Sequence, residues 1–277
     1  MKARYLIFGH GFLGQEFSRH YGNQGVLSSV DITHEIALRQ EIERVKPTFL
    51  INTAARTQTA ALEKKENQEE GFRTNVYGPA LLGKLTIEYG LRLLHLSTGM
   101  FYDGPQLASE DNLVLPTNYY SWTKAWAESV LQTFGPDAPF IIVRIHLPVT
   151  GSTHPRNLLH KICQFNRFTT TPSSLTVIPD FLTACDQLIN LRAKGTFNIV
   201  NKGVISLMEI ARKLQAAGLI PADQKLEALT RGQLDALGGA KQTFPVLSTE
   251  KLEGLGIHLP EVSMAVDRCI ESLIKSS

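Results

Sequence analysis

Short apolar runs alternate with segments of helical spacing along the first half of the chain. The runs lie at residues 3–8, 25–30, 48–55, 91–98 and 140–148. The helical segments between them lie at residues 12–22, 34–45, 74–90 and 119–135. Buried strands that alternate with helices of this length are typical of right-handed β-α-β crossovers in a mostly parallel sheet. The pattern therefore predicts an α/β fold with a Rossmann-type, doubly wound parallel sheet.

The rhythm changes after Pro148. Two short strands are expected at residues 175–179 and 196–200, and helices are expected at residues 153–165, 206–218 and 262–277. This mixture predicts a smaller, mixed C-terminal lobe that binds the substrate. We place the dinucleotide-binding Rossmann domain at residues 1–150 and the substrate lobe at residues 151–277. A segment near residues 181–200 can return a helix and a strand to the main sheet.

Composition narrows the class of protein. The chain has 277 residues, of which 43% are hydrophobic and 19% are charged, so it can bury a substantial core. Its 28 basic and 26 acidic side chains leave a net charge of +2, which favours neither a nucleic-acid partner nor an anionic membrane. No apolar run is long enough for a membrane span, and the three cysteines show no paired spacing. We expect a cytoplasmic protein with reduced thiols and no metal site, because the histidines show no ligand spacing.

A glycine-rich turn follows the first apolar run and opens the first helical segment. It reads Gly9-His10-Gly11-Phe12-Leu13-Gly14, a G-x-G-x-x-G pattern. The first glycine permits a tight turn, the second lets backbone amides approach a pyrophosphate, and the third lets the helix pack on the strand. The amino end of the helix adds partial positive charge. The pattern alone is weak, but its position between a strand and a helix predicts a dinucleotide site, with contacts from Gly9, Gly11, Phe12, Leu13 and Gly14.

Asp31 follows the second apolar run, 17 residues after Gly14. A carboxylate there can accept hydrogen bonds from the adenosine ribose, which favours NAD. The same residue can instead cap the next helix. Asp31 and Ile32 can also lie beside the adenine, a position that does not discriminate against a 2′-phosphate. Both NADP(H) and NAD(H) therefore stay open as cofactors.

Tyr120 and Lys124 lie four residues apart in a segment of helical spacing, so both can face one cleft. A cation close to a phenol favours the phenolate and lowers the pKa of the tyrosine, which suits a proton donor. Surface tyrosine and lysine pairs of this spacing are also common. Ser97 and Thr98 end the preceding apolar run, where a hydroxyl can bind a substrate carbonyl or only cap a turn. Together with the glycine turn, these residues indicate a carbonyl reductase.

At this point the chain resembles the extended short-chain dehydrogenase/reductase family, and within it the dTDP-4-dehydrorhamnose reductase group. The resemblance rests on "FGHGFLG", "KPTFLINTAARTQ", "TNVYGPALL", "LSTGMFYDG", "YYSWTKAWAE" and "VRIHLPV", which span most of the chain. The later stretches "HPRNLLHKI", "PSSLTVIPDFL" and "GTFNIVNKGVISLMEI" are most similar to the UDP-rhamnose epimerase/reductase branch.

The resemblance implies an oxidoreductase of deoxysugar biosynthesis. Such relatives reduce the 4-keto group of a nucleotide-linked 4-keto-6-deoxyhexose, with NADP(H) favoured as the cofactor. In this chain Thr98 would position the keto oxygen, Tyr120 would protonate it, and Lys124 would hold the nicotinamide ribose. The resemblance implies further cofactor contacts at Thr53, Ala54, Ala55 and Asn75, although Asn75 can equally be a polar residue at the start of a helix. It implies substrate contacts at Gly99, Met100 and Lys161, although a lone helical lysine can also be a solvated charge. Arg144, Arg156 and Asn157 can reach a nucleotide diphosphate, because guanidinium groups suit phosphate oxygens. The stretch "HPRN" can instead start a helix, with Pro155 near its first position.

One departure from the family pattern bears on the reaction. The epimerase/reductase branch carries Gly-Cys after the threonine, whereas this chain carries Gly99-Met100. A thioether has no ionisable proton, so Met100 cannot serve in an epimerisation. We expect a 4-ketoreductase, with a bifunctional 3,5-epimerase/4-reductase or a nucleotide-sugar epimerase as one alternative and a non-catalytic NADP-binding regulatory subunit as another. The expected partner is the nucleotide sugar, and a homodimer stays open.

Overall fold

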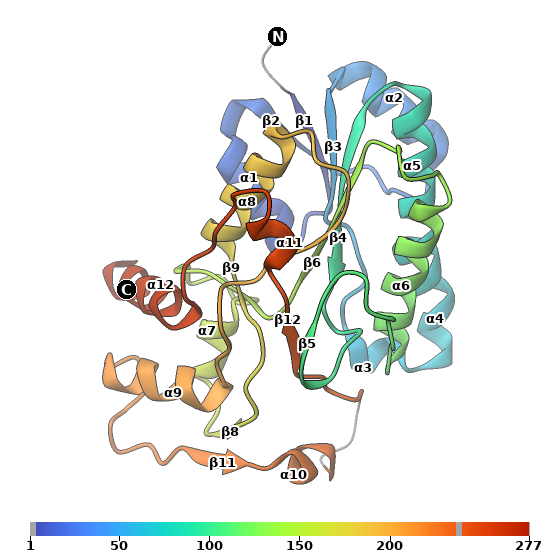
Figure 1. Cartoon of the computed structure of the whole chain (residues 1–277). Helices are drawn as coiled ribbons and strands as arrows, with labels where there is room; N and C mark the ends of the chain where they lie inside the picture. The colour runs from blue at the N-terminus through green and yellow to red at the C-terminus, as the bar shows by residue number, and fades with distance from the viewer. Residues whose placement is uncertain (1–3, 237–239, 277) are drawn as a thin grey trace. The chain divides into compact units, whose positions relative to one another are not determined.

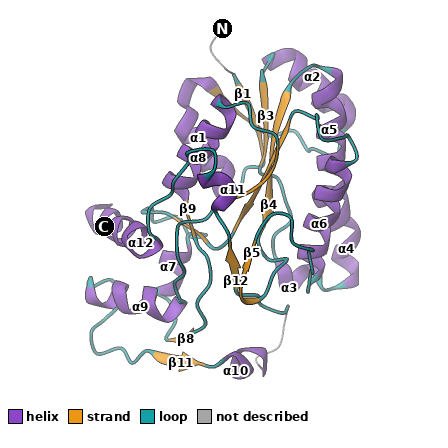
Figure 2. Cartoon of the chain, in the orientation of Figure 1, coloured by secondary structure: helices purple, strands orange, loops and turns teal. Residues whose placement is uncertain are grey.

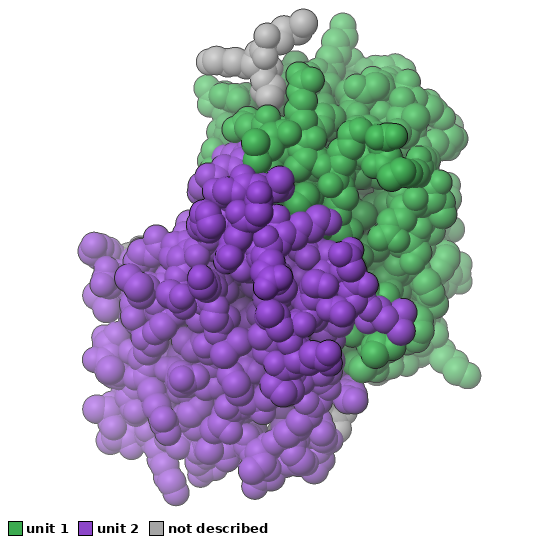
Figure 3. All heavy atoms as spheres, in the orientation of Figure 1, with its two compact units in different colours: residues 1–101, 114–144, 188–197 green, residues 102–113, 145–187, 198–277 purple. Residues whose placement is uncertain are grey.

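The computed structural model describes residues 4–236 and 240–276. The chain divides into two compact units, which Figure 3 shows in separate colours. Unit 1 comprises Met1–Phe101, Val114–Arg144 and Leu188–Phe197, and unit 2 comprises Tyr102–Leu113, Ile145–Gln187 and Asn198–Ser277. The chain therefore passes between the units several times. The boundary predicted near residue 150 stays a prediction.

A six-stranded sheet, in the order β10-β6-β4-β3-β1-β2, forms the centre of unit 1 (Figure 2). Its strands are β1 (Tyr5–Phe8), β2 (Gly25–Ser28), β3 (Phe49–Asn52), β4 (Arg92–Thr98), β6 (Phe140–Ile145) and β10 (Gly195–Asn198). β1 pairs in parallel with β2 on one side and β3 on the other, and β3 pairs in parallel with β4. The predicted Rossmann-type α/β class is confirmed. The connections after β1 and β3 lead to opposite sides of β1, and open α/β sheets bind ligands at the carboxyl ends of strands where the order reverses in this way.

Helices cover both faces of the sheet in unit 1. Figure 1 shows α2, α5 and α6 on one face and α1 on the other. The bounds are α1 (Phe12–Tyr21), η1 (Gly22–Gln24), α2 (Glu35–Val45), α3 (Thr59–Leu62), α4 (Lys65–Phe72), η2 (Arg73–Tyr77), α5 (Gly78–Glu88) and α6 (Tyr119–Gln132). Strand residues such as Leu6, Leu50 and Leu93 are fully buried against Leu38 of α2 and Leu82 of α5. This apolar layer fixes the sheet beneath the helices.

Two features of unit 1 differ from the pattern expected from the sequence. α3 and α4 were not expected, because "KENQEEGF" has only a weak apolar stripe and its one buried residue is Gly71. The helix expected at residues 74–90 instead begins as a π-helix, η2, which α5 continues. A π-turn admits one extra residue and changes the direction of the side chains it carries. This change concerns Asn75, which lies in η2.

Unit 2 is a mixture of short strands and helices around its own core. Three two-stranded sheets pair β5 with β12, β7 with β9, and β8 with β11. The strands are β5 (Gly104–Ala108), β7 (Pro148–Val149), β8 (Arg167–Thr169), β9 (Thr176–Val177), β11 (Glu227–Leu229) and β12 (Pro245–Leu247). The helices are α7 (Leu158–Ile162), α8 (Ile178–Asn190, ending in unit 1), α9 (Leu207–Ala216), α10 (Arg231–Ala236), α11 (Glu250–Glu253) and α12 (Val262–Ser276). Buried residues of α7, α9 and α12, among them Leu159, Leu214 and Val266, form the core.

α7 is much shorter than the helix expected at residues 153–165. The interpretation that it starts near Pro155 is wrong, because the helix begins at Leu158 and Asn157 is its N-cap. The Asn157 side-chain oxygen accepts hydrogen bonds from the backbone of Leu159 and Thr150. The preceding residues are held outside the helix by these bonds, which "HPRN" as a pattern does not reveal.

Candidate active site

The glycine turn between β1 and α1 is a closely packed backbone cradle. Gly9 has a φ of +100°, and a Cβ atom there would lie 2.5 Å from the backbone nitrogen of Ala54. A Cβ on Gly14 would lie 1.8 Å from the carbonyl oxygen of Gly9. Both positions therefore require glycine. Gly11 is the N-cap of α1, and no side chain occupies the cap, so the first amides of the helix are available to an anion.

The loop after β3 forms the other side of this cradle. The Thr53 hydroxyl donates to the carbonyl oxygens of Phe8, at 2.7 Å, and Gly9, at 3.1 Å. The Asn52 side-chain oxygen accepts from the Ala54 amide at 3.0 Å. The Thr53 bonds join the ends of two neighbouring parallel strands, and the Asn52 bond is local to the loop. Backbone amides, glycines and a helix N-terminus at such an edge fit the pyrophosphate of a dinucleotide.

Asn75 connects the loop after β3 to α6. It is fully buried in η2, and its side-chain oxygen accepts from the Arg56 amide at 2.7 Å. Its side-chain nitrogen donates to the Arg56 carbonyl oxygen at 3.0 Å and to the Thr123 hydroxyl at 2.9 Å. Arg56 follows Ala55, one of the expected cofactor contacts. Asn75 therefore holds the cradle loop in place from the helix side.

The residues expected near the adenosine occupy different environments. β2 ends at Ser28, so Asp31 lies in the turn beyond the strand, and its carboxylate accepts from the Thr33 amide at 2.8 Å. The bond from Thr33 helps to lower the pKa of Asp31, against the opposing effect of burial. Ile32 is buried, and a Cβ on Gly78 of α5 would lie 2.5 Å from it. Both adenosine contacts stay predictions.

Tyr120 lies in the first turn of α6. The helix begins at Tyr119, and its N-cap, Asn118, forms a capping box with Ser121. Burial raises the pKa of Tyr120 to about 12, and a hydrogen bond with Thr98 opposes this shift. Thr98 is the last residue of β4, and its hydroxyl also accepts from the Met100 amide at 3.2 Å. The structure thus brings together the phenol and the hydroxyl that the sequence singled out.

The expected effect of Lys124 on Tyr120 is not found. The pKa of Tyr120 is raised rather than lowered, because the effect of burial outweighs that of the hydrogen bond with Thr98. The Lys124 amine instead donates to the Leu96 carbonyl oxygen and lies 3.5 Å from Nε2 of His95. Burial lowers the pKa of Lys124 to about 8, although the Glu128 carboxylate opposes this shift. A phenol that stays protonated at neutral pH is the form required to donate a proton.

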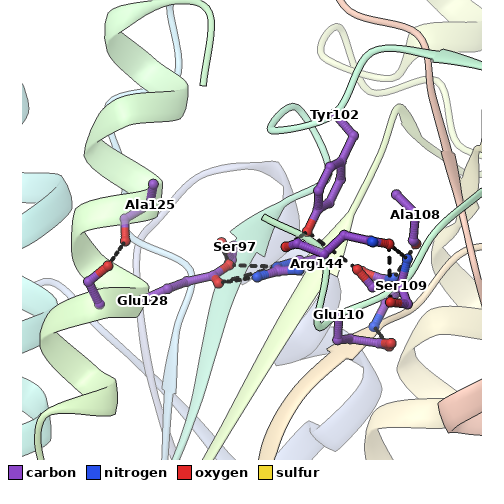
Figure 4. Close-up of polar contacts among 11 residues, drawn as sticks. Ser97, Tyr102, Ala108, Ser109, Glu110, Ala125, Glu128 and Arg144 are labelled. Carbon is purple, nitrogen blue, oxygen red and sulfur yellow. Dashed lines mark hydrogen bonds and ion pairs between the residues drawn. The ribbon is translucent and has the colours of Figure 1, made fainter. Parts of the chain in front are cut away.

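A buried ion pair lies one helical turn beyond Lys124. Figure 4 shows the Glu128 carboxylate of α6 between Arg144 and Ser97. Glu128 accepts from Nε of Arg144 at 3.0 Å and from Nη2 at 2.7 Å, and Ser97 donates to the same carboxylate. Both charged side chains are almost fully buried, and the guanidinium lies over the Phe101 ring. Arg144 was expected to bind substrate phosphate, and in this arrangement its guanidinium is bound to Glu128.

Five further expected substrate residues lie in two places. Gly99 is buried directly after β4, and Met100 is half-buried beside it. Arg156 and Lys161 are exposed in unit 2, Lys161 on α7 and Arg156 just before it. Asn157 is buried and its side-chain nitrogen donates to the carbonyl oxygens of Thr150 and Ser152, each at 2.6 Å. The Asn157 side chain therefore holds the start of α7 against the preceding loop. The substrate contacts of these residues stay predictions.

Three buried polar residues of the site were not identified from the sequence: Asn52, His95 and Glu128. A signal existed for two of them. Glu128 lies four residues after Lys124 on the same helix face, and His95 lies two residues before Ser97 on the same face of β4. Within residues 4–236 and 240–276, no group of three or more histidine, cysteine or acidic side chains is placed to hold a metal ion. Nor is any helix in these ranges long and apolar enough to cross a membrane.

Known proteins resemble this chain along its whole length. Residues 3–274 match the family described as the RmlD substrate binding domain. The L780 protein of Acanthamoeba polyphaga mimivirus is 25% identical, with 98% of each chain covered. The crystal structure of the L780 UDP-rhamnose synthase superposes with a TM-score of 0.88 at 24% identity and covers 97% of this chain and 99% of L780.

Two further relatives carry names of the same kind. A bifunctional dTDP-4-dehydrorhamnose 3,5-epimerase/dTDP-4-dehydrorhamnose reductase of Arabidopsis thaliana is 28% identical over 74% of this chain and 72% of its own. A dTDP-4-dehydrorhamnose reductase of Bacillus anthracis, crystallised with NADP, gives a TM-score of 0.84 at 19% identity and full coverage of both chains. These matches confirm the resemblance read from the sequence, and the chain belongs to the RmlD substrate binding domain family.

Proposed function

We propose that this chain is an NADPH-dependent oxidoreductase of the extended short-chain dehydrogenase/reductase type. It reduces the 4-keto group of a nucleotide-linked 4-keto-6-deoxyhexose, and NADH is an alternative donor. The observation that carries this proposal is the hydrogen bond between Thr98 and Tyr120 at the carboxyl end of β4. It supports a site in which one hydroxyl binds a keto oxygen and another protonates it. The relatives named as dTDP-4-dehydrorhamnose reductases support the same substrate class.

The proposed proton path begins at Tyr120. NADPH, when bound, supplies the hydride to the carbonyl carbon. Thr98 orients the keto oxygen, and the Tyr120 phenol gives its proton to the alkoxide that develops there. The phenolate left behind takes a proton from the Lys124 ammonium, which regains one from solvent. The pKa of Tyr120, about 12, is higher than that of Lys124, about 8, so the transfer of a proton from the Lys124 ammonium to the Tyr120 phenolate is favourable.

Replacing Tyr120 by phenylalanine tests the proposal. We expect turnover to fall by ~10²-fold or more, because a positioned general acid contributes that much, while NADPH affinity stays nearly unchanged. The matched control is Tyr119→Phe, which removes a neighbouring phenol that donates to the Gln68 carbonyl oxygen at 3.1 Å. Equal turnover of Tyr120→Phe and the parent chain would exclude Tyr120 as the proton donor.

A second candidate function is an epimerase/reductase, and the name of the Arabidopsis relative favours it. Met100 argues against this second activity, because its thioether cannot exchange a proton. Deuterium wash-in at C3 or C5 of the sugar, measured in D2O without cofactor, separates the two functions. We expect no wash-in for the parent chain. Met100→Cys places an ionisable thiol beside Thr98, and a gain of exchange in that variant alone would identify position 100 as the determinant.

The substrate nucleotide is proposed to contact unit 2. Arg156 and Lys161 are exposed there, and guanidinium and ammonium groups bind phosphate oxygens. Arg156→Ala should therefore raise KM for the nucleotide sugar and leave kcat and NADPH affinity unchanged. A homodimer stays a prediction, and sedimentation or light scattering of the full chain measures it.

A further inference from the structure

Three buried side chains form a continuous polar path from the cofactor cradle to the Lys124 amine. Asn52 ends β3, His95 lies in the middle of β4, and Lys124 lies on α6. Asn52 is 1% exposed, His95 is 0% exposed and Lys124 is 2% exposed. Nδ2 of Asn52 lies 3.0 Å from Nδ1 of His95, and Nε2 of His95 lies 3.5 Å from Nζ of Lys124. All three belong to unit 1.

The backbone fixes the orientation of the Asn52 amide. Its side-chain oxygen accepts from the Ala54 amide at 3.0 Å, and a backbone N–H can only donate. The side-chain nitrogen therefore faces His95 and donates to Nδ1. Reversing the amide would place its NH2 group against the Ala54 N–H and leave a buried donor without an acceptor, which is costly.

The Asn52 donor in turn fixes the tautomer of His95. Nδ1 accepts a hydrogen bond and so carries no proton, which places the ring hydrogen of the neutral imidazole on Nε2. If Nδ1 were protonated, its N–H group would face the NH2 group of Asn52, and neither donor would have an acceptor there. Burial and the Lys124 charge also hold the pKa of His95 well below its usual range, so the ring stays neutral. The Nε2–H group then points at the Lys124 amine.

This arrangement distinguishes the two protonation states of Lys124. A neutral amine has a lone pair that can accept from the His95 Nε2–H while the amine donates to the Leu96 carbonyl oxygen. An ammonium has donors only, so it faces the Nε2–H group without a matching acceptor. We propose that His95, with its tautomer fixed by Asn52, is a positioning residue that holds the Lys124 amine and favours its neutral form. His95 thereby sets the pH above which Lys124 no longer resupplies the proton of Tyr120.

Other charged groups act on Lys124 from its surroundings. Glu128 lies one turn further along α6, and its carboxylate favours the ammonium. That carboxylate is bound by Arg144 of β6 and by Ser97 of β4, which weakens its effect. Tyr120 lies one turn earlier on α6 and is neutral at neutral pH because burial raises its pKa. His95 of β4 is therefore the neighbour whose hydrogen bonding depends on the protonation state of Lys124.

The tautomer can be measured without any turnover. Long-range 1H–15N spectra of histidine-labelled protein distinguish a protonated Nδ1 from a protonated Nε2. We expect the His95 signal, assigned by its absence from His95→Gln, to show a proton on Nε2 alone from about pH 6 to about pH 9, below and above the titration of Lys124. A proton on Nδ1 in the parent chain would overturn the proposal.

Asn52→Asp is the sharpest variant because it keeps the shape and reverses the hydrogen bonding. One carboxylate oxygen still accepts from Ala54, and the other now accepts from His95, so the ring proton moves to Nδ1. Nε2 then accepts from the Lys124 ammonium. We expect the pH above which reduction slows to rise by one unit or more, and the Lys124 titration followed by 13C-lysine NMR to rise equally. His95→Gln, whose side-chain oxygen can accept from the ammonium, should raise both in the same direction.

The inference rests on the proposed function only for the role of Lys124 in turnover. The tautomer and the lysine titration are read from the protein itself, so they test the network even if the substrate assignment fails. A Lys124 titration unchanged in both Asn52→Asp and His95→Gln would refute the network. An altered titration with an unaltered pH profile of reduction would refute the link to proton resupply. If Asn52→Asp does not fold, the parent tautomer and His95→Gln still decide the question.

Discussion

Replacing Lys124 by methionine should change how the stability of the fold depends on pH. Burial lowers the pKa of this lysine from 10.5 to about 8. Between these two values the unfolded chain binds more protons than the folded chain, so the free energy of unfolding rises with pH. Each pKa unit corresponds to ~1.4 kcal/mol, and the wild-type chain should therefore gain about 3 kcal/mol as the pH rises through this interval. Below pH 8 the full cost of the buried charge is present.

The methionine variant lacks this term because its side chain does not titrate. It also loses the hydrogen bond to the Leu96 carbonyl oxygen, a cost of ~1–3 kcal/mol that does not vary with pH. The difference in unfolding free energy between the variant and the wild type should thus shift by about 3 kcal/mol in favour of the variant as the pH falls from 10.5 to 8. Other titrating groups cancel in this difference. Reductase turnover should be lost in the same variant.

Urea unfolding of both proteins, followed by circular dichroism across this pH interval, measures the difference directly. The slope of the free energy against urea concentration should be the same for the two chains, because the surface exposed on unfolding hardly changes. Two stability curves that run parallel in pH would show that Lys124 titrates in the fold as it does in the unfolded chain. The reasoning from burial would then be wrong.

Two further predictions use substitutions of unit 1. Glu128→Leu leaves the buried Arg144 guanidinium without its carboxylate and should lower the free energy of unfolding by about 3–5 kcal/mol. The double variant Glu128→Leu/Arg144→Met should lose at least ~2 kcal/mol less than the sum of the two single variants, and additive losses in urea unfolding would contradict this coupling. Gly9→Ala should abolish NADPH binding measured by fluorescence titration, because its Cβ would meet Ala54. Gly22 also has a positive φ, +51°, but a Cβ there would meet no atom within 4 Å. Gly22→Ala should therefore lower the free energy of unfolding by ~1 kcal/mol and leave NADPH binding intact. Equal effects of the two changes on binding would contradict the role of Gly9 in the cradle.

The sequence predicts the sheet and the reacting groups because each depends on local patterns. Apolar runs that end just before Gly9 and at Thr98 mark the carboxyl ends of two strands, and the spacing of Tyr120 and Lys124 places both on one helix face. The fold class and the family resemblance were confirmed by the structure and by the relatives. These patterns identify the types of the residues and the helix or strand face on which each lies, which is enough to predict a carbonyl reduction.

The contacts between distant segments could not be predicted in this way. The Lys124 amine contacts Leu96 and His95, and the Arg144 guanidinium binds Glu128, because strands and helices far apart in the sequence pack together. Burial then sets the pKa of Tyr120 in the direction opposite to the one expected from its neighbour on the helix. The π-turn that aims Asn75 likewise has no periodic signal, since it breaks the period.

The return of the chain to the sheet limits how this protein can be cut. β10, at Gly195–Asn198, is an edge strand of the sheet. In the sequence it comes after one long segment of unit 2, Ile145–Gln187, and before another, Asn198–Ser277. A gene fragment that stops near residue 150 would lack that strand and would leave the peptide groups of β6 unpaired. Bare edges of this kind recruit strands from other copies, so such a fragment should aggregate. Residues 1–150 are thus not expected to fold as an independent module, and any graft or biosensor built from them must carry β10 as well.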